Sequence, residues 1–477
     1  MRAFDELGLF WLADHEEQAL SGRLQFDPEG DGISLSLVGV FDNEPDDGGH
    51  STFRIVGWRG NDKVTLDRCF SRGRNSRAPG IAESGYYANQ MFVGHHFERD
   101  ELAFQSASVV LSDLDSWVGR SGIALEEPHP QSASGPQPIY KMTFTPPGEE
   151  TSRFSRGRLK LMFGWKPAGD PIHGISFRQW PGIRIEYDQM QEFEVIRKDV
   201  GRIQDLLTLC IDAPTAIDSL ILQRPDIRAK AISGEETDFQ QRIEFIAQPL
   251  RYFDPQERKP RHWHQMFLGF EEFGGLDAIA RWLDASQGFQ RPLDSLMSIR
   301  HAKPMYAENR FLNVTFAAEA FHRMVTSGAS YMNEDAFTSL MNVYLAETPD
   351  EHHEWLRGRI EHGNEPPLGK RLRQLASRAG AAARPLIGKR ERWAYTLSQV
   401  RNELTHIGPK SREFRGEDLV FLTESVYAVV RICMLMECGV SHEILTSKAN
   451  SSSMSWYRDR LVRSMERVRS QLEGPMS

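Results

Sequence analysis

The chain has 477 residues and a formal net charge of −9 at pH 7, and 40% of its residues are hydrophobic. This length suits two or three domains, and the composition is that of an ordinary globular protein. The negative charge excludes generic, whole-surface binding of nucleic acid, so any RNA contact has to be a local basic patch.

Residues 1–190 form the first predicted domain, which is rich in β-strands. Ile33, Leu35 and Leu37 alternate with serines at the period of two that is typical of a half-buried strand. Short apolar runs at 53–58 and 158–165 are further candidate strands, and turn residues separate the runs. We therefore expect a β-rich N-terminal domain.

One segment of this domain is basic. Arg68, Arg72, Arg74 and Arg77 lie around the aromatic residue Phe70. Clustered arginines beside an aromatic ring can contact phosphates and bases, so these four arginines are candidate RNA-binding residues. A solvated loop explains them equally well.

After Tyr187 the hydrophobic period changes from strand to helix. Ile196, Val200 and Ile203 begin an amphipathic helical pattern, and helical or mixed segments continue to about residue 300. Residues 191–300 are therefore predicted to be a helical or mixed extension of the N-terminal region. From Met305 onward the pattern is helical throughout, which predicts an all-α bundle over residues 301–477. The expected fold class is α+β.

The first helix of the predicted bundle carries a polar stripe beside its apolar one. Thr315, Glu319, His322 and Thr326 recur at helical spacing along it. Glu319 is a candidate partner for a catalytic arginine, and His322 is a candidate RNA-binding residue. A solvated helix face is the alternative explanation for both.

A helix late in the bundle holds the most informative residues of the chain, Arg401, Asn402 and His406. One apolar stripe predicts this helix, and its members are Trp393, Leu397, Val400, Leu404 and Ile407. Gly408 and Pro409 then give the usual signal for a helix end.

These three residue types suit metal-free cleavage of RNA. Histidine moves protons near neutral pH, arginine holds a phosphate, and asparagine orients either group. The spacing alone is a weak signal, and a second Arg-x4-His pair runs from Arg357 to His362. That second pair lacks the asparagine and is interrupted by Gly358, so we interpret it as a chance match.

The whole pattern resembles the HEPN superfamily, whose signature is an arginine, a polar residue and a histidine a few residues on. The segments Glu308–Leu312 and Ala318–Arg323 are similar to the first helix of the ApeA-type HEPN group. The N-terminal region resembles the domain that accompanies that group. Its matching segments are Gly8–Leu12, Gly22–Pro28, Phe92–Phe97 and Leu111–Val118.

The resemblance implies a bacterial antiphage effector that cuts host RNA after infection and halts growth, with transfer RNA as a candidate substrate. HEPN nucleases act without metal or other cofactor, as dimers or dimers of dimers, and two copies of the motif meet in one site. The implied reaction leaves a 2′,3′-cyclic phosphate and a 5′-hydroxyl, so DNA should resist. The N-terminal region would respond to a phage-derived trigger or inhibitor and gate the bundle.

Two other functions stay open at this point. In the first, the bundle is a non-catalytic HEPN dimerisation or binding module beside a β-rich ligand-binding domain, and His406 is dispensable. In the second, the N-terminal region carries the function as a carbohydrate- or protein-binding β module, since its sequence shows no cluster of catalytic residues.

The remaining expectations concern location. The four cysteines include no Cys-x-x-Cys pair, so we expect neither disulfides nor a zinc site, which suits a reducing cytoplasm. The acidic start of the chain predicts no signal peptide. No apolar stretch approaches the roughly 18 residues needed to span a bilayer, so we expect a cytoplasmic protein without membrane contact.

Overall fold

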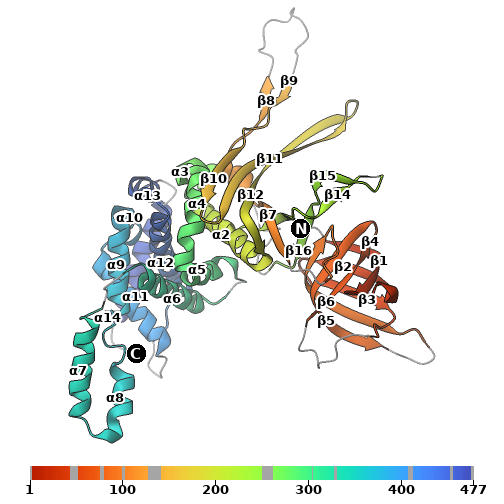
Figure 1. Ribbon diagram of the computed structural model, residues 1–477. Coiled ribbons are helices and arrows are strands. Elements are labelled where there is room, and N and C mark those ends of the chain that lie inside the picture. Colours follow the sequence, from red (N-terminus) through yellow and green to blue (C-terminus); the bar gives the residue numbers. More distant parts are fainter. Residues whose placement is uncertain are drawn as a thin grey trace, which may run out of the picture. The chain divides into compact units, whose positions relative to one another are not determined.

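The computed structural model describes residues 3–42, 52–75, 80–98, 102–126, 141–231, 233–249, 261–302, 305–326, 330–406, 412–451 and 455–473. The chain divides into two compact units, Met1–Leu283 and Asp284–Ser477 (Figure 1). The first unit is rich in strands and the second is helical, which confirms the α+β fold class.

Six strands of the first unit close into a barrel, in the order β6-β3-β2-β1-β4-β5, with β5 pairing back onto β6. The strands are β1 (Phe4–Leu12), β2 (Leu20–Asp27), β3 (Gly32–Val38), β4 (Phe53–Arg59), β5 (Asp62–Asn75) and β6 (Glu83–Val93). Ile33, Leu35 and Leu37 of β3 point into the barrel core, as their alternation predicts. The intervening Ser36 is exposed on the outer face.

The far half of β6 also pairs with β16, and the sheet continues from there away from the barrel. Its order is β16-β13-β7-β12-β11-β10. These strands are β7 (Ala103–Leu111), β10 (Glu150–Phe154), β11 (Gly157–Asp170), β12 (Gly174–Glu192), β13 (Ile217–Gln223) and β16 (Ile243–Ala247). The predicted helical or mixed extension, residues 191–300, thus includes the strands β13 and β16, which complete the sheet.

Helix α2 (Phe193–Ile211) packs on this second part of the sheet through β7 and β12. The predicted apolar stripe of this helix, which includes Ile196, Val200 and Ile203, is buried. The first unit also contains α1 (Leu114–Val118), α3 (Phe270–Phe273), α4 (Gly275–Ala285), the hairpin of β8 (Ile123–Glu126) and β9 (Lys141–Phe144), and the pair β14 (Arg228–Lys230) and β15 (Glu236–Gln240).

The second unit is a bundle of helices around α12. Its members are α5 (Gln290–His301), α6 (Ala307–Val325), α7 (Glu334–Ala346), α8 (His353–Ile360), α9 (Leu368–Ala379), α10 (Arg384–Ile387), α11 (Arg390–Thr405), α12 (Gly416–Glu437), α13 (His442–Ala449) and α14 (Ser455–Glu473). Helix α12 packs against α6, α9 and α14. Helix α5 packs on α6, so the bundle begins before residue 301, where the sequence had suggested its start.

Helix α12 is the one helix in the described part of the chain that is long and apolar enough to cross a membrane. The expectation that no stretch reaches this length was therefore wrong. However, 83% of the most apolar window of α12 is buried inside the bundle, which is the environment of a core helix.

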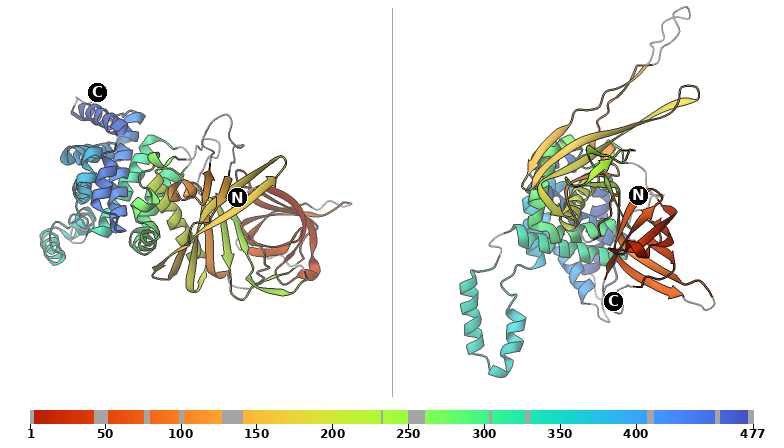
Figure 2. Two further views of the ribbon diagram at one scale, coloured as in Figure 1. Left: turned by 90° about the horizontal axis from the view of Figure 1, so that it is seen from above. Right: turned by 45° about the vertical axis from the view of Figure 1, so that its right-hand side comes forward.

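Helices α7 and α8 form a hairpin that stands away from the rest of the bundle (Figure 2). The predicted N-cap of α7 is confirmed, because the Asn333 side chain accepts a hydrogen bond from the Asp335 backbone N–H at 2.8 Å. Neither helix contains a buried residue. Val343 and Trp355 are among the large apolar side chains that the hairpin exposes.

Candidate functional site

Helix α11 carries the predicted Arg-Asn-x-x-x-His motif and is held in the bundle by its apolar stripe. Trp393, Leu397 and Val400 are completely buried. The indole Nε1–H of Trp393 also donates a hydrogen bond of 2.8 Å to the Ser425 hydroxyl of α12. These contacts fix the helix about its axis and so decide which side chains it presents outward.

The helix ends at Thr405, and His406 is its C-cap residue with φ −113° and ψ 56°. We expected His406 inside the last turn and the end at Gly408 and Pro409, which lie with Ile407 outside the described residues. The backbone N–H of His406 still donates to the Asn402 carbonyl at 3.0 Å. The imidazole is therefore anchored to the helix through its own backbone, and the residue is exposed.

Arg401 lies between the polar end of α11 and helix α6. Its guanidinium is 3.8 Å from the Glu319 carboxylate and 3.4 Å from the Asn402 side-chain oxygen. The Arg401 side chain is 35% exposed and that of Glu319 is 20% exposed. A pair this long and this exposed adds little stability, but it leaves donors of the arginine facing solvent, where a phosphate oxygen can reach them.

Glu403 is a residue of this region that the sequence interpretation missed. Its carboxylate pairs with the Arg412 guanidinium at 2.8 Å and accepts a weaker hydrogen bond from the Arg412 backbone N–H at 3.4 Å. The pair therefore holds Arg412 beside Glu403, near the end of α11. Their opposite charges, nine residues apart in the sequence, were the signal that could have found them.

Much of the polar stripe of α6 is packed inside the bundle. Thr315 and His322 are buried, and Glu319 turns toward Arg401. The Nε2–H of His322 donates to the Gln374 side-chain oxygen of α9 at 2.8 Å. His322 was a candidate RNA-binding residue; its burial instead gives it a structural part, because no ligand can reach it without opening the bundle.

The buried imidazole of His322 makes the stability of the bundle depend on pH. Burial lowers the pKa of His322, the nearby positive charge of Arg371 adds to that effect, and the Gln374 bond opposes it. The unfolded chain therefore binds more protons than the folded one below about pH 6.5, and the contribution of His322 to stability is lost as the pH falls. We expect the melting temperature of His322→Gln to fall less than that of the wild type between about pH 7 and about pH 5.5. Equal losses in circular dichroism melts would contradict this.

The basic segment of the first unit is a strand, because Arg68, Arg72 and Arg74 all lie on β5. Arg68 is engaged by Glu194 of α2 at 2.8 Å. The Arg72 guanidinium lies 5.3 Å from the centre of the Tyr87 ring. Arg77 lies outside the described residues. These arginines belong to a different unit from Arg401, Asn402, His406 and Glu319, so the candidate residues form two groups.

No group of three or more histidine, cysteine, aspartate or glutamate side chains is placed to hold a metal ion within the residues that the structure describes. All four cysteines are free and buried.

A strand-rich unit joined to a helical bundle with Arg-Asn-x-x-x-His at a helix end defines a two-part protein with a HEPN-type helical domain. Comparison with family models agrees. The model for ApeA N-terminal domain 1 matches residues 5–282, and the model for Apea-like HEPN matches residues 312–444, which include Glu319, Arg401 and His406. The chain belongs to the ApeA family, and its two domains support assignment to the antiphage HEPN nucleases. No curated relative and no solved structure matches the chain.

Proposed function

We propose that the protein is a metal-independent endoribonuclease of antiphage defence whose active site is built on the end of α11. The observation that carries this proposal is the grouping of Arg401 and Asn402 with Glu319 of α6, next to the exposed His406. Few other functions call for a fixed cation, an amide and an imidazole at one exposed helix end.

The proposed reaction uses the RNA itself as nucleophile. His406 accepts the proton of a 2′-hydroxyl, the 2′-oxygen attacks the adjacent phosphorus, and the bond from phosphorus to the 5′-oxygen breaks. A protonated imidazole then supplies a proton to the departing 5′-oxygen. Arg401 stabilises the charge that develops on the phosphate oxygens, and Asn402 orients the arginine. The products are a 2′,3′-cyclic phosphate and a 5′-hydroxyl.

This chemistry needs one imidazole as base and a second as acid, whereas the motif offers one histidine per chain. We therefore propose a homodimer, or a dimer of dimers, in which two copies of the α11 end face each other. Sedimentation of the purified protein checks this step. A fully active species that remains monomeric at assay concentration would contradict the shared site.

We further propose that the substrate is host RNA in the cytoplasm, with transfer RNA as the first candidate because its cleavage halts translation. A nuclease of this kind has to be restrained until infection. The first unit is the part of the chain large enough to sense a phage-derived trigger or inhibitor and to shift the bundle between states of unequal activity.

The direct test is incubation of the purified full-length protein with total RNA in EDTA. The proposal expects discrete RNA fragments that do not form with a variant lacking His406. Intact RNA under all conditions, including with extract from infected cells, would favour the alternative in which the bundle only dimerises or binds a partner.

Glu319 should act as a positioning residue for Arg401. Replacing Glu319 by glutamine removes the charge that holds the guanidinium, and we expect kcat to fall about 10-fold with little change in KM or melting temperature. Glu319→Asp should recover part of the loss. The matched control is Glu308→Gln at the start of the same helix, which should leave cleavage unchanged. Equal effects of the two glutamine variants would remove Glu319 from the site.

A further inference from the structure

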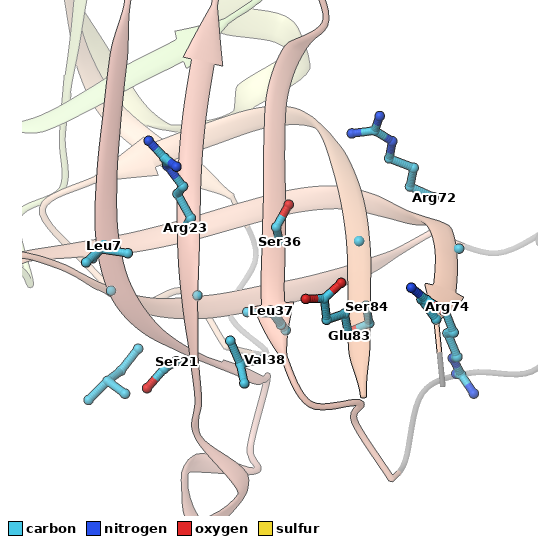
Figure 3. Close-up of a pocket in the computed structure, with 16 residues that line it drawn as sticks. Leu7, Ser21, Arg23, Ser36, Leu37, Val38, Arg72, Arg74, Glu83 and Ser84 are labelled. Atoms are coloured by element: carbon cyan, nitrogen blue, oxygen red, sulfur yellow. The ribbon is translucent and has the colours of Figure 1, made fainter. Parts of the chain in front are cut away.

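The outer face of the barrel carries a groove of about 710 Å³ that lies across five strands of the first unit (Figure 3). The strand register places Arg23, Ser36, Gly85 and Gly73 in one row on neighbouring strands. Ser36 and Gly73 are small, so a ligand can approach the sheet closely at these two positions, whereas the Arg72 side chain covers Gly85. A side chain at Gly73 would meet nothing within 4 Å, and the glycine is required there by its backbone φ of +143°.

Arginines lie on both sides of this row of residues. Figure 3 shows Arg23 on one side of Ser36, and Arg72 and Arg74 on the other. Glu83 is the one acidic side chain among the lining residues. Arg23 is already paired with the Asp5 carboxylate at 2.5 Å, so the positive charge of the groove comes mainly from Arg72 and Arg74. In a chain with a net charge of −9, these two arginines make a local basic patch. Such a patch suits a phosphate-bearing ligand.

Aromatic rings continue the same face by one more row along the strands. Phe70 of β5 lies opposite Tyr87 of β6, with ring centres 5.6 Å apart, and Phe70 is 38% exposed. Arg72 lies over the Tyr87 ring and so joins the aromatic pair to the basic groove. On the opposite rim, Leu7 and Leu9 are exposed. Flat apolar surfaces beside cations are the means by which proteins hold unpaired nucleobases.

The groove also contains side chains that can form hydrogen bonds. Ser21 and Ser36 are exposed, and within the described part of the chain their hydroxyls have no hydrogen-bond partner. When RNA lies close to the sheet, such serine hydroxyls can form hydrogen bonds with ribose 2′-hydroxyls, which DNA lacks. A duplex would present mainly phosphates to this face and leave the aromatic pair unused.

We propose that this groove binds single-stranded RNA, with Arg72 and Arg74 on phosphates and the Phe70–Tyr87 pair stacking on a base. The inference rests on the proposed function in that it supplies a ribonuclease with a second RNA-contacting surface. It goes further by assigning that surface to the barrel and by naming single strands as the ligand.

The test is fluorescence anisotropy with a labelled single-stranded RNA of about 12 nucleotides, within the usual range for such surfaces. All proteins are full length and carry His406→Ala. Arg72→Gln with Arg74→Gln should weaken binding at least about 10-fold and lower the slope of log affinity against log salt by about 1.4, since each lost phosphate contact removes about 0.7. Phe70→Ala should weaken binding about 10-fold with the slope unchanged.

The matched control is Arg178→Gln, because Arg178 is an exposed arginine on β12 that does not line this groove. It should bind like the parent. Equal weakening by the control and the double variant would overturn the proposal. So would equal affinity for duplex RNA, or binding of anionic phospholipid vesicles that the same arginine variants abolish while RNA binding is unchanged. If the His406→Ala protein still cuts the probe, the proposed nuclease site fails, whereas the comparison among groove variants still decides this inference.

Discussion

His406→Ala should reduce RNA cleavage by the full-length protein at least about 100-fold, because the variant loses the group that moves the proton. Arg401→Ala should reduce cleavage by about 100- to 1000-fold, since it removes a charged donor from the transition state. Both residues lie off the buried stripe of α11, so their melting temperatures should stay near that of the wild type. Gel analysis of RNA in EDTA and thermal melts measure the two effects.

The matched control for these variants is His362→Ala. His362 is the histidine of the second Arg-x4-His spacing, and its side chain is 76% exposed next to Glu361 and Glu365. If that spacing is a chance match, the variant should cleave RNA at the wild-type rate. A folded His406→Ala protein that cleaves as fast as His362→Ala would exclude the α11 site.

Trp393→Ala should lower the free energy of unfolding of the bundle by about 3–5 kcal/mol. Trp393 is completely buried, and its indole N–H is bonded to Ser425, so the substitution creates a cavity and also leaves the hydroxyl without that partner. Because Trp393 fixes α11, activity should fall together with stability. Urea unfolding followed by far-ultraviolet circular dichroism measures the loss.

Tyr395→Ala serves as the control on the same helix, because Tyr395 is 58% exposed. It should change the free energy of unfolding by no more than about 0.5 kcal/mol. A Trp393→Ala protein as stable as Tyr395→Ala would mean that α11 is not anchored as described.

Local patterns in the sequence predicted much of the bundle. The apolar stripe of α11 and the N-cap at Asn333 depend on neighbouring residues. The N-cap is confirmed, and so is the stripe at Trp393, Leu397 and Val400, whereas Leu404 is half-buried and Ile407 lies outside the described residues. The end of α11 was placed too late, because Gly408 and Pro409 signal a stop but do not decide the last turn before it. The burial of His322 was missed because helical spacing shows that polar residues share a face and not what covers that face. Gln374 of α9, far along the chain, supplies the partner.

In the first unit, local patterns do not predict which strands pair. β13 and β16 follow α2 in the sequence yet join the sheet between β7 and β6, and no local signal encodes that pairing. The groove on the barrel depends on the register of five strands. Arg23 and Arg72 are far apart in sequence and come to one face only because β3 and β6 lie between their strands. The sequence drew attention to the arginines of β5, but it gave no sign that Ser36, Gly85 and Gly73 would lie in one row beside them.

The chemistry of the RNA ends tests the central claim most directly. An RNA cut by the purified protein in EDTA should carry a 2′,3′-cyclic phosphate on one fragment and a 5′-hydroxyl on the other. A substrate with a single 2′-deoxy nucleotide at the cleaved position should stay intact there, because the attacking oxygen is missing. Fragments with a 3′-hydroxyl and a 5′-phosphate, or cutting at the deoxy position, would contradict the account.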